Sequence, residues 1–145
     1  MTRIKVGDQV PDLSLPTQAG ETISVTDYRD KRCVVLFFYP KDGTPLCTQE
    51  VCGFRDAYED FVEVEAAVNG VSSDSVGRHQ MFSLNNQLPF LLLADCDGAL
   101  RKVFGIRKVL GLLPRRITYV IDRQGIVRHL CDAQTSVRRH ITESL

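Results

Sequence analysis

Apolar residues in this chain gather in short runs bounded by turn residues, and these runs predict the strands of a buried sheet. The run at 34–39 holds six apolar residues in succession, which is typical of a parallel strand covered on both faces. Similar runs predict core strands within 62–71, ending near Gly70, and at 90–94 and 117–121. The pattern therefore indicates four strands in the core.

Two hairpins are predicted outside these core strands. Residues 10–16 alternate apolar and polar positions between prolines, and 22–25 alternate again, which predicts a short edge hairpin. Near the other end, 122–125 predicts a tight turn and 126–130 the antiparallel strand that returns from it.

Apolar residues at intervals of three and four predict helices between the strands. The clearest helix runs from residue 46 or 47 to about 61, with Val51, Phe54 and Phe61 on its apolar stripe. The other predicted segments are a helical turn at 26–30 with Thr26 as N-cap, a helix from the capping residues 72–75 to about Leu84, a helix at 99–104, a loop at 107–114 and a helix at 135–145.

The order of these elements determines the predicted fold class. Strands that alternate with helices, followed by a hairpin and a last helix, indicate an α/β three-layer domain with a central mixed sheet and flanking helices. A chain of 145 residues can bury its own core, so residues 1–145 are predicted to form a single domain.

Composition narrows the possible partners and the location. The formal net charge is zero, which argues against the basic field that bulk nucleic-acid binding requires. No apolar stretch approaches the roughly 18–20 residues that span a bilayer, and no signal-peptide pattern is visible at the start. We therefore expect no nucleic-acid or membrane partner and a cytoplasmic location, with a processed organelle form left open.

The cysteines indicate redox chemistry. There are five, an odd number, at irregular spacing: Cys33, Cys47, Cys52, Cys96 and Cys131. Without an export signal, this pattern argues against a static disulfide framework and favours reactive thiols, with the remaining cysteines as small buried residues.

Cys47 stands where a helix should begin, directly after the predicted strand 34–39 and a turn rich in proline and glycine. The first N–H groups of a helix lack partners and carry the positive end of its dipole. Both effects favour the thiolate, which is the nucleophilic form of cysteine.

The stretch Y-P-K-D-G-T-P-L-C-T-Q-E at 39–50 resembles the peroxidatic-cysteine signature of peroxiredoxins. Cys52, the turn at 122–125 and the sequence R-I-T-Y-V-I-D at 116–122 narrow the resemblance to the peroxiredoxin Q, or bacterioferritin-comigratory, subfamily. The similarity covers nearly the whole chain. It implies a thioredoxin-like fold and thiol-dependent reduction of hydrogen peroxide and organic hydroperoxides.

The resemblance also implies roles for individual residues. Cys47 matches the peroxidatic cysteine, which becomes a sulfenic acid on oxidation. Thr44 would offer its hydroxyl to the thiolate and the peroxide, and Pro40 would cover the site. The family spacing R-x-T-Y selects Arg116, rather than Arg115, as the cation beside the sulfur. Glu50, one helical turn after the cysteine, would orient this arginine or a neighbouring backbone donor rather than act as an acid.

Cys52 matches the resolving cysteine of the subfamily, which would form an intramolecular disulfide with Cys47. Five residues along an ideal helix correspond to a rise of about 7.5 Å and leave the two side chains roughly 140° apart. A disulfide needs Cα atoms within about 7 Å, so the helix would have to unwind between the two residues. The disulfide would then be reduced by thioredoxin or a similar dithiol, and a resolver within the same chain favours a monomer.

Several alternatives stay open. If Cys52 does not resolve, the protein is a one-cysteine peroxidase or a thiol-based redox sensor, or Cys96 or Cys131 resolves in its place. A general dithiol oxidoreductase is disfavoured because two cysteines of that kind are normally separated by two residues. No cofactor or metal is expected, because the histidines, predicted at the surface, have no ligand spacing and no paired ligand clusters occur. The preferred peroxide depends on pocket shape.

Overall fold

The computed structural model describes residues 3–106 and 116–132, which form a five-stranded sheet, a small two-stranded sheet and several helices. The strands are β1 (Leu15–Pro16), β2 (Thr22–Ile23), β3 (Cys33–Phe38), β4 (Ala66–Ser72), β5 (Leu91–Ala94), β6 (Ile117–Ile121) and β7 (Val127–Asp132). The helices are the 3₁₀ turn η1 (Val25–Tyr28), α1 (Pro45–Asp56), α2 (Tyr58–Glu63), α3 (Val76–Asn86) and α4 (Ala99–Val103).

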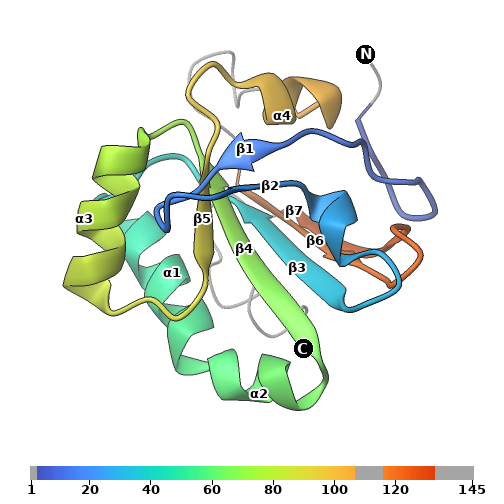
Figure 1. The fold of residues 1–145 in the computed structure, drawn as a ribbon, viewed down its shortest axis with the longest axis horizontal. Coiled ribbons are helices and arrows are strands. Elements are labelled where there is room, and N and C mark those ends of the chain that lie inside the picture. The colour runs from blue at the N-terminus through green and yellow to red at the C-terminus, as the bar shows by residue number, and fades with distance from the viewer. Residues whose placement is uncertain (1–2, 107–115, 133–145) are drawn as a thin grey trace.

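The central sheet is mixed, as the sequence predicts. Its five strands lie in the order β5-β4-β3-β6-β7 (Figure 1). β3, β4 and β5 are parallel to one another, and β6 and β7 are antiparallel to their neighbours. The small hairpin β1–β2 is a separate sheet that passes in front of the central one in Figure 1. The thioredoxin-like architecture is therefore confirmed.

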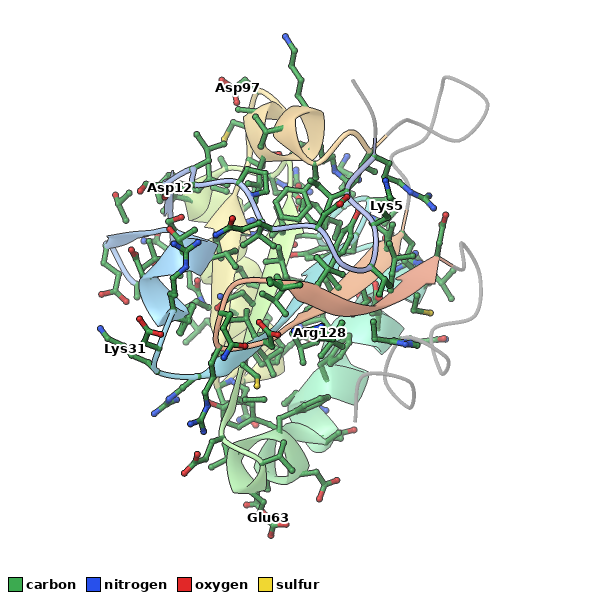
Figure 2. All side chains as sticks on the ribbon, turned by 90° about the vertical axis from the view of Figure 1, so that its right-hand side faces the viewer. Lys5, Asp12, Lys31, Glu63, Asp97 and Arg128 are labelled. Carbon is green, nitrogen blue, oxygen red and sulfur yellow. The ribbon has the colours of Figure 1, made fainter. Side chains whose placement is uncertain are left out.

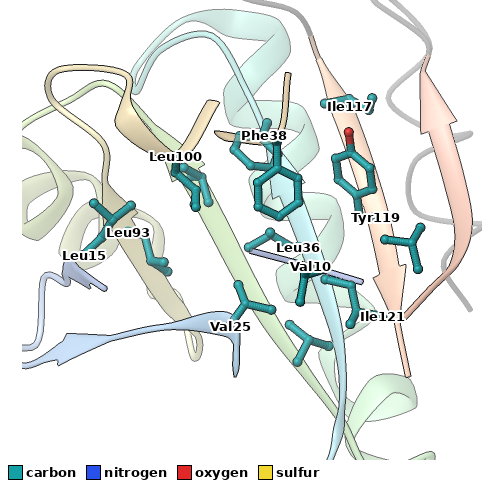
Figure 3. Close-up of a cluster of buried hydrophobic side chains, with 14 residues drawn as sticks. Val10, Leu15, Val25, Leu36, Phe38, Leu93, Leu100, Ile117, Tyr119 and Ile121 are labelled. Atoms are coloured by element: carbon teal, nitrogen blue, oxygen red, sulfur yellow. The ribbon is translucent and has the colours of Figure 1, made fainter. Parts of the chain in front are cut away.

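The two faces of β3 enter two different hydrophobic clusters, which explains its uninterrupted apolar run. Val34, Leu36 and Phe38 join the cluster shown in Figure 3, which β1, β6 and α4 complete. The intervening residues Val35 and Phe37 join the cluster that α1, α2 and α3 cover. Side chains alternate along a strand, so a strand covered on both faces has apolar residues at every position.

The predicted helix from 46 to about 61 is two helices in the structure. α1 ends at Asp56, and Ala57, with ψ near zero, separates it from α2. Alanine has the highest intrinsic helix propensity, so nothing local marks this break. It results from tertiary packing, because Phe54 before the break and Phe61 after it both enter the second cluster.

Thr26 is not the N-cap of the first helical turn. The cap is Ser24, whose side chain accepts a hydrogen bond from the Thr26 N–H, while the Asp27 carboxylate accepts from the Ser24 N–H. The Thr26 hydroxyl donates instead to Asp12. The N-cap is therefore two residues earlier than predicted, and it forms a reciprocal capping box that the sequence S-V-T-D also permits.

The first strand of the predicted edge hairpin is much shorter than 10–16, because only Leu15 and Pro16 pair with β2. The remaining predicted elements within the described residues occur within a few residues of their expected ends. The predicted loop at 107–114 and helix at 135–145 lie outside the described residues, as does His140, and the single domain over 1–145 stays a prediction. Within 3–106 and 116–132, no helix has the length and apolar character that crossing a membrane requires. Charge is spread over the surface: the six charged residues labelled in Figure 2 are all exposed, namely Lys5, Asp12, Lys31, Glu63, Asp97 and Arg128.

Candidate active site

The motif that contains Cys47 lies at the carboxyl end of β3. β3 ends at Phe38, the chain turns through 39–44, and α1 begins at Pro45. Thr44 is the N-cap, with extended backbone angles. Proline suits the first helical position, because an N–H there would have no partner within the helix. In open α/β sheets, ligands bind outside the carboxyl ends of the strands, so this is the expected place for a site.

Cys47 lies in the first turn of α1, and its side chain is only 1% exposed. Arg116, the residue before β6, directs its guanidinium at this sulfur, with Nη2 3.5 Å from Sγ. The pairing of β6 with β3 explains the approach: Ile117 is the register partner of Phe38, so Arg116 reaches the end of β3 where the motif begins. The predicted juxtaposition of Arg116 with Cys47 is therefore present.

Glu50 completes a buried cluster with these two residues. Nη1 of Arg116 donates to Glu50 Oε1 at 2.6 Å while Nη2 faces the sulfur, so one planar guanidinium contacts both groups. Burial raises the pKa of Glu50 from 4.5 to about 7, and the charge of Arg116 offsets only part of this effect. Burial lowers the pKa of Arg116, but Glu50 and Cys47 outweigh it and the net direction is upward. Arg116 therefore stays charged.

Thr44 and Pro40 lie in the loop that leads to Cys47. The Thr44 hydroxyl donates to the carbonyl oxygen of Lys41 at 3.0 Å. A hydroxyl has one hydrogen, so Thr44 closes the loop in this conformation and must rotate to donate to a sulfur or a peroxide. Pro40 is partly buried and lies two residues after the end of β3.

Cys52 lies on the same helix as Cys47, and the two are separate thiols. The Cys52 side chain is partly buried, and its Sγ donates to Oδ1 of Asn86 at 3.4 Å. α1 is continuous between the two cysteines, which keeps their sulfur atoms on different sides of the helix.

A second buried polar cluster supports the loop, and it includes a histidine that the sequence placed at the surface. That prediction is wrong for His79, which is fully buried on α3. Its Nδ1 lies 2.6 Å from Oδ2 of Asp42, whose Oδ1 accepts from the Tyr39 hydroxyl at 2.5 Å. The Asp42 N–H donates to Asp74 at 2.7 Å. The loop between β3 and α1 is thus tied from inside to α3 and to the segment that joins β4 to α3.

The same cluster is a geometric candidate for a metal site among the described residues. Asp42, Asp74 and His79 each offer one ligand atom within 4.8 Å of the others. These atoms already form hydrogen bonds with one another or with Ser72, whose hydroxyl donates to Asp74 at 2.6 Å. The arrangement fits an internal support for the loop better than a cation site, since a ligand needs a lone pair directed at the metal.

Comparison with known proteins identifies the family. A family model described as the AhpC/TSA family matches residues 6–130. This chain belongs to the AhpC/TSA family. Proteins of this family named peroxiredoxins are thiol-dependent peroxidases, so membership supports such an activity.

Relatives within the family are proteins named peroxiredoxin Q and Bcp. The chain is 39% identical to peroxiredoxin Bcp of Bacillus subtilis over 98% of its length and 93% of the relative. It is 40% identical to the chloroplastic peroxiredoxin Q of Triticum aestivum, which it matches over 99% of its own length and 66% of the relative's. The chain thus spans about two thirds of the plant relatives, and the cytoplasmic location stays a prediction.

Solved structures of proteins named BcpB and PrxQ are also similar to this chain. Peroxidoxin BcpB from Mycobacterium tuberculosis superposes with a TM-score of 0.90 at 36% identity, covering 98% of this chain and 94% of that one. A PrxQ mutant from Xylella fastidiosa superposes with a TM-score of 0.89 at 28% identity, covering 99% and 94%. The predicted resemblance to the peroxiredoxin Q subfamily is confirmed.

Sequence reasoning also missed an arginine of this site. Arg101 on α4 donates through Nη2 to the Tyr39 carbonyl oxygen at 2.9 Å, and its guanidinium lies 5.3 Å from the centre of the Phe38 ring. Burial lowers its pKa to about 10, while Asp95, Cys47 and further anionic groups favour its charged form. It is thus a second cation near the sulfur of Cys47. Its position could have pointed to the site, because Arg101 lies in a helix that follows the carboxyl end of β5, and sites in such sheets lie at the carboxyl ends of the strands.

Proposed function

We propose that this chain is a thiol-dependent peroxidase of the atypical two-cysteine kind, in which Cys47 is oxidised by a hydroperoxide and Cys52 resolves the product. One observation carries the proposal: a buried cysteine in the first turn of a helix accepts a hydrogen bond from Arg116, whose other amino group is held by Glu50. A fixed cation that faces a sulfur stabilises its thiolate and stabilises negative charge that develops beside it.

In the first step, the Cys47 thiolate attacks the terminal oxygen of the hydroperoxide. The sulfur–oxygen bond forms as the oxygen–oxygen bond breaks, which leaves Cys47 sulfenic acid and an alkoxide or hydroxide that takes up a proton. Arg116 faces the region where this charge develops. Preorganised donors of this type lower the barrier because they need no reorganisation during the reaction.

Thr44 and Pro40 act on the peroxide. Rotation of the Thr44 hydroxyl away from the Lys41 carbonyl allows it to donate to the bound oxidant. Pro40 limits the access of water and restricts the loop, since its ring fixes φ. Glu50 keeps the guanidinium of Arg116 in the orientation that reaches the sulfur.

In the second step, the Cys52 thiol attacks the sulfenic sulfur of Cys47, which forms a disulfide and releases water. The folded α1 cannot bring the two sulfur atoms together, so the first turns of the helix unwind before this step. The strained disulfide is then reduced by two thiols of an external dithiol such as thioredoxin. Both sulfur atoms come from one chain, so a monomer suffices.

Coupled peroxide consumption tests the proposal. With thioredoxin, its reductase and NADPH, the wild-type protein should consume hydrogen peroxide, and Cys47→Ser should abolish turnover. Cys52→Ser should keep the first oxidation fast and stop recycling by thioredoxin. Loss of α1 helix signal in circular dichroism should accompany oxidation of the wild type.

The control is Cys33→Ala. Cys33 begins β3 and lies about 20 Å along the strand direction from Tyr39, so its loss should leave turnover unchanged. Persistent turnover in Cys47→Ser would rule out the proposed function. Normal recycling in Cys52→Ser would instead move the resolving role to Cys96, Cys131 or an external thiol, or indicate a one-cysteine peroxidase or sensor.

A further inference from the structure

The C-terminal end of α3 holds Cys52 in place. Cys52 Sγ lies 3.4 Å from Oδ1 of Asn86, the last residue of α3. Nδ2 of the same amide donates to the Phe82 carbonyl oxygen at 3.0 Å. Because a carbonyl can only accept, the amide must place its NH₂ group toward Phe82 and its oxygen toward Cys52. The thiol is therefore the donor in this hydrogen bond.

Arg55 makes a second contact with the same residue. Its Nη1 donates to the backbone carbonyl oxygen of Asn86 at 2.8 Å. The last carbonyls of a helix lack partners within the helix, and the negative end of its dipole favours a cation there. Arg55 and Cys52 are three residues apart and share one face of α1. Both contacts thus attach the second half of α1 to the end of α3.

We propose that Asn86 is a positioning residue that latches Cys52 in the folded helix and so limits the rate of disulfide formation. The proposal rests on the proposed function, in which Cys52 resolves oxidised Cys47. Cys52 must leave Asn86 before the two sulfur atoms can meet, because they point roughly 140° apart in the helix. Arg55 anchors α1 directly beyond Cys52, which confines the unwinding to the turns between the two cysteines.

The hydrogen bond between Cys52 and Asn86, called the latch below, affects which of two reactions Cys47 sulfenic acid undergoes. In one, Cys52 forms the disulfide and water leaves. In the other, a second hydroperoxide transfers an oxygen to the sulfenic sulfur, which becomes sulfinic acid while the peroxide is reduced to an alcohol or water. A slower release of Cys52 gives the second reaction more time. Asn86 therefore sets the peroxide concentration at which the protein is overoxidised.

The side chain can be removed without loss of the neighbouring contact. Asn86→Ala deletes the acceptor for Cys52 but keeps the backbone carbonyl that Arg55 binds. Asn86→Leu also deletes the acceptor while it preserves most of the side-chain volume. One hydrogen bond from a weak thiol donor corresponds to roughly a twofold to fivefold change in rate. Both variants should form the disulfide faster by this factor, with the oxidation of Cys47 unchanged.

Rapid mixing with hydrogen peroxide, acid quench and intact mass measurement follow the two steps, because the disulfide is lighter than the sulfenic acid by one water. The peroxide dose that yields half sulfinic acid should rise by the same factor in both variants. Asn85→Ala is the matched control, since Asn85 is the exposed neighbour on the same helix. It should behave like the wild type in both measurements.

The outcomes separate this proposal from the one on which it rests. If peptide mapping of the oxidised wild type finds no Cys47–Cys52 disulfide, the proposed resolving role fails and the latch fails with it. If that disulfide forms but both Asn86 variants resolve at the wild-type rate or more slowly, only the latch is overturned. A twofold to fivefold acceleration in both variants, absent in Asn85→Ala, supports it.

Discussion

Replacing Glu50 by glutamine should change how the stability of the protein depends on pH. Glu50 is fully buried against Arg116, and burial raises its pKa from 4.5 to about 7. An acid with a raised pKa binds more protons in the folded than in the unfolded state between these two values. The free energy of unfolding should therefore fall as pH rises from 4.5 to about 7, because ionised Glu50 is less compatible with its buried site.

The size of this effect follows from the same two values. Each pH unit between them is worth about 1.36 kcal/mol, so the full interval corresponds to on the order of 3 kcal/mol. Glutamine resembles the protonated carboxyl group and keeps an oxygen that can accept from Arg116, but it does not titrate. Glu50→Gln should therefore lose this part of the pH dependence.

Urea unfolding of the reduced protein across this pH interval is the assay. The difference in unfolding free energy between wild type and Glu50→Gln should shift by on the order of 3 kcal/mol in favour of the variant as pH rises. Glu59→Gln, which changes an exposed carboxylate on α2, is the matched control and should leave the slope intact. If the unfolding free energies of the wild type and Glu50→Gln change with pH in parallel, the reasoning is refuted. It is also refuted if the infrared difference spectrum, wild type minus Glu50→Gln, shows no carbonyl stretch of a protonated carboxyl group below pH 7.

Substitutions at three further residues test other parts of the structure. Gly70→Ala should destabilise the protein by about 1–3 kcal/mol in urea unfolding, because a Cβ there would lie 2.8 Å from side-chain atoms of Leu92 and Phe37; an unchanged midpoint would contradict this packing. Ser24→Ala removes the N-cap of η1 and should cost about 1 kcal/mol in the same experiment. Arg116→Lys keeps a charge but loses the fork that contacts sulfur and carboxylate together, so the rate constant for the first oxidation should fall by at least about tenfold, and Arg116→Met by about 10²–10³. Wild-type rates in Arg116→Met, measured by peroxide consumption in a single turnover, would remove this residue from the chemistry.

The motif that contains Cys47 could be found from the sequence because the features that mark it are consecutive along the chain. A buried strand, a turn of prolines and glycine and a cysteine at a helix start follow one another within 34–47. The arginine beside the sulfur came from the family spacing R-x-T-Y, which selected Arg116 rather than Arg115. The structure supplied the physical reason, which is the antiparallel register of β6 against β3.

The hydrogen bonds that hold this motif in place could be found only from the tertiary structure. Three polar residues on helices provide this support: His79, Arg101 and Asn86. Their neighbours in the sequence do not show whether such a side chain is buried against a partner or exposed to solvent. His79 contacts a loop residue that is 37 positions away, and Arg101 a carbonyl that is 62 positions away. The break at Ala57 likewise contradicts local propensity.

The sequence by itself therefore indicated the core strands, the fold class and Cys47 as the candidate reactive cysteine, since periodicity and helix-end chemistry depend on neighbours along the chain. Tertiary structure alone decided the contacts that His79, Arg101 and Asn86 make around that part of the protein. Those contacts join segments that meet only when the sheet orders β5, β4, β3 and β6 side by side. Burial then gives them their strength, because a buried charge or donor must find its partner inside the protein rather than in water.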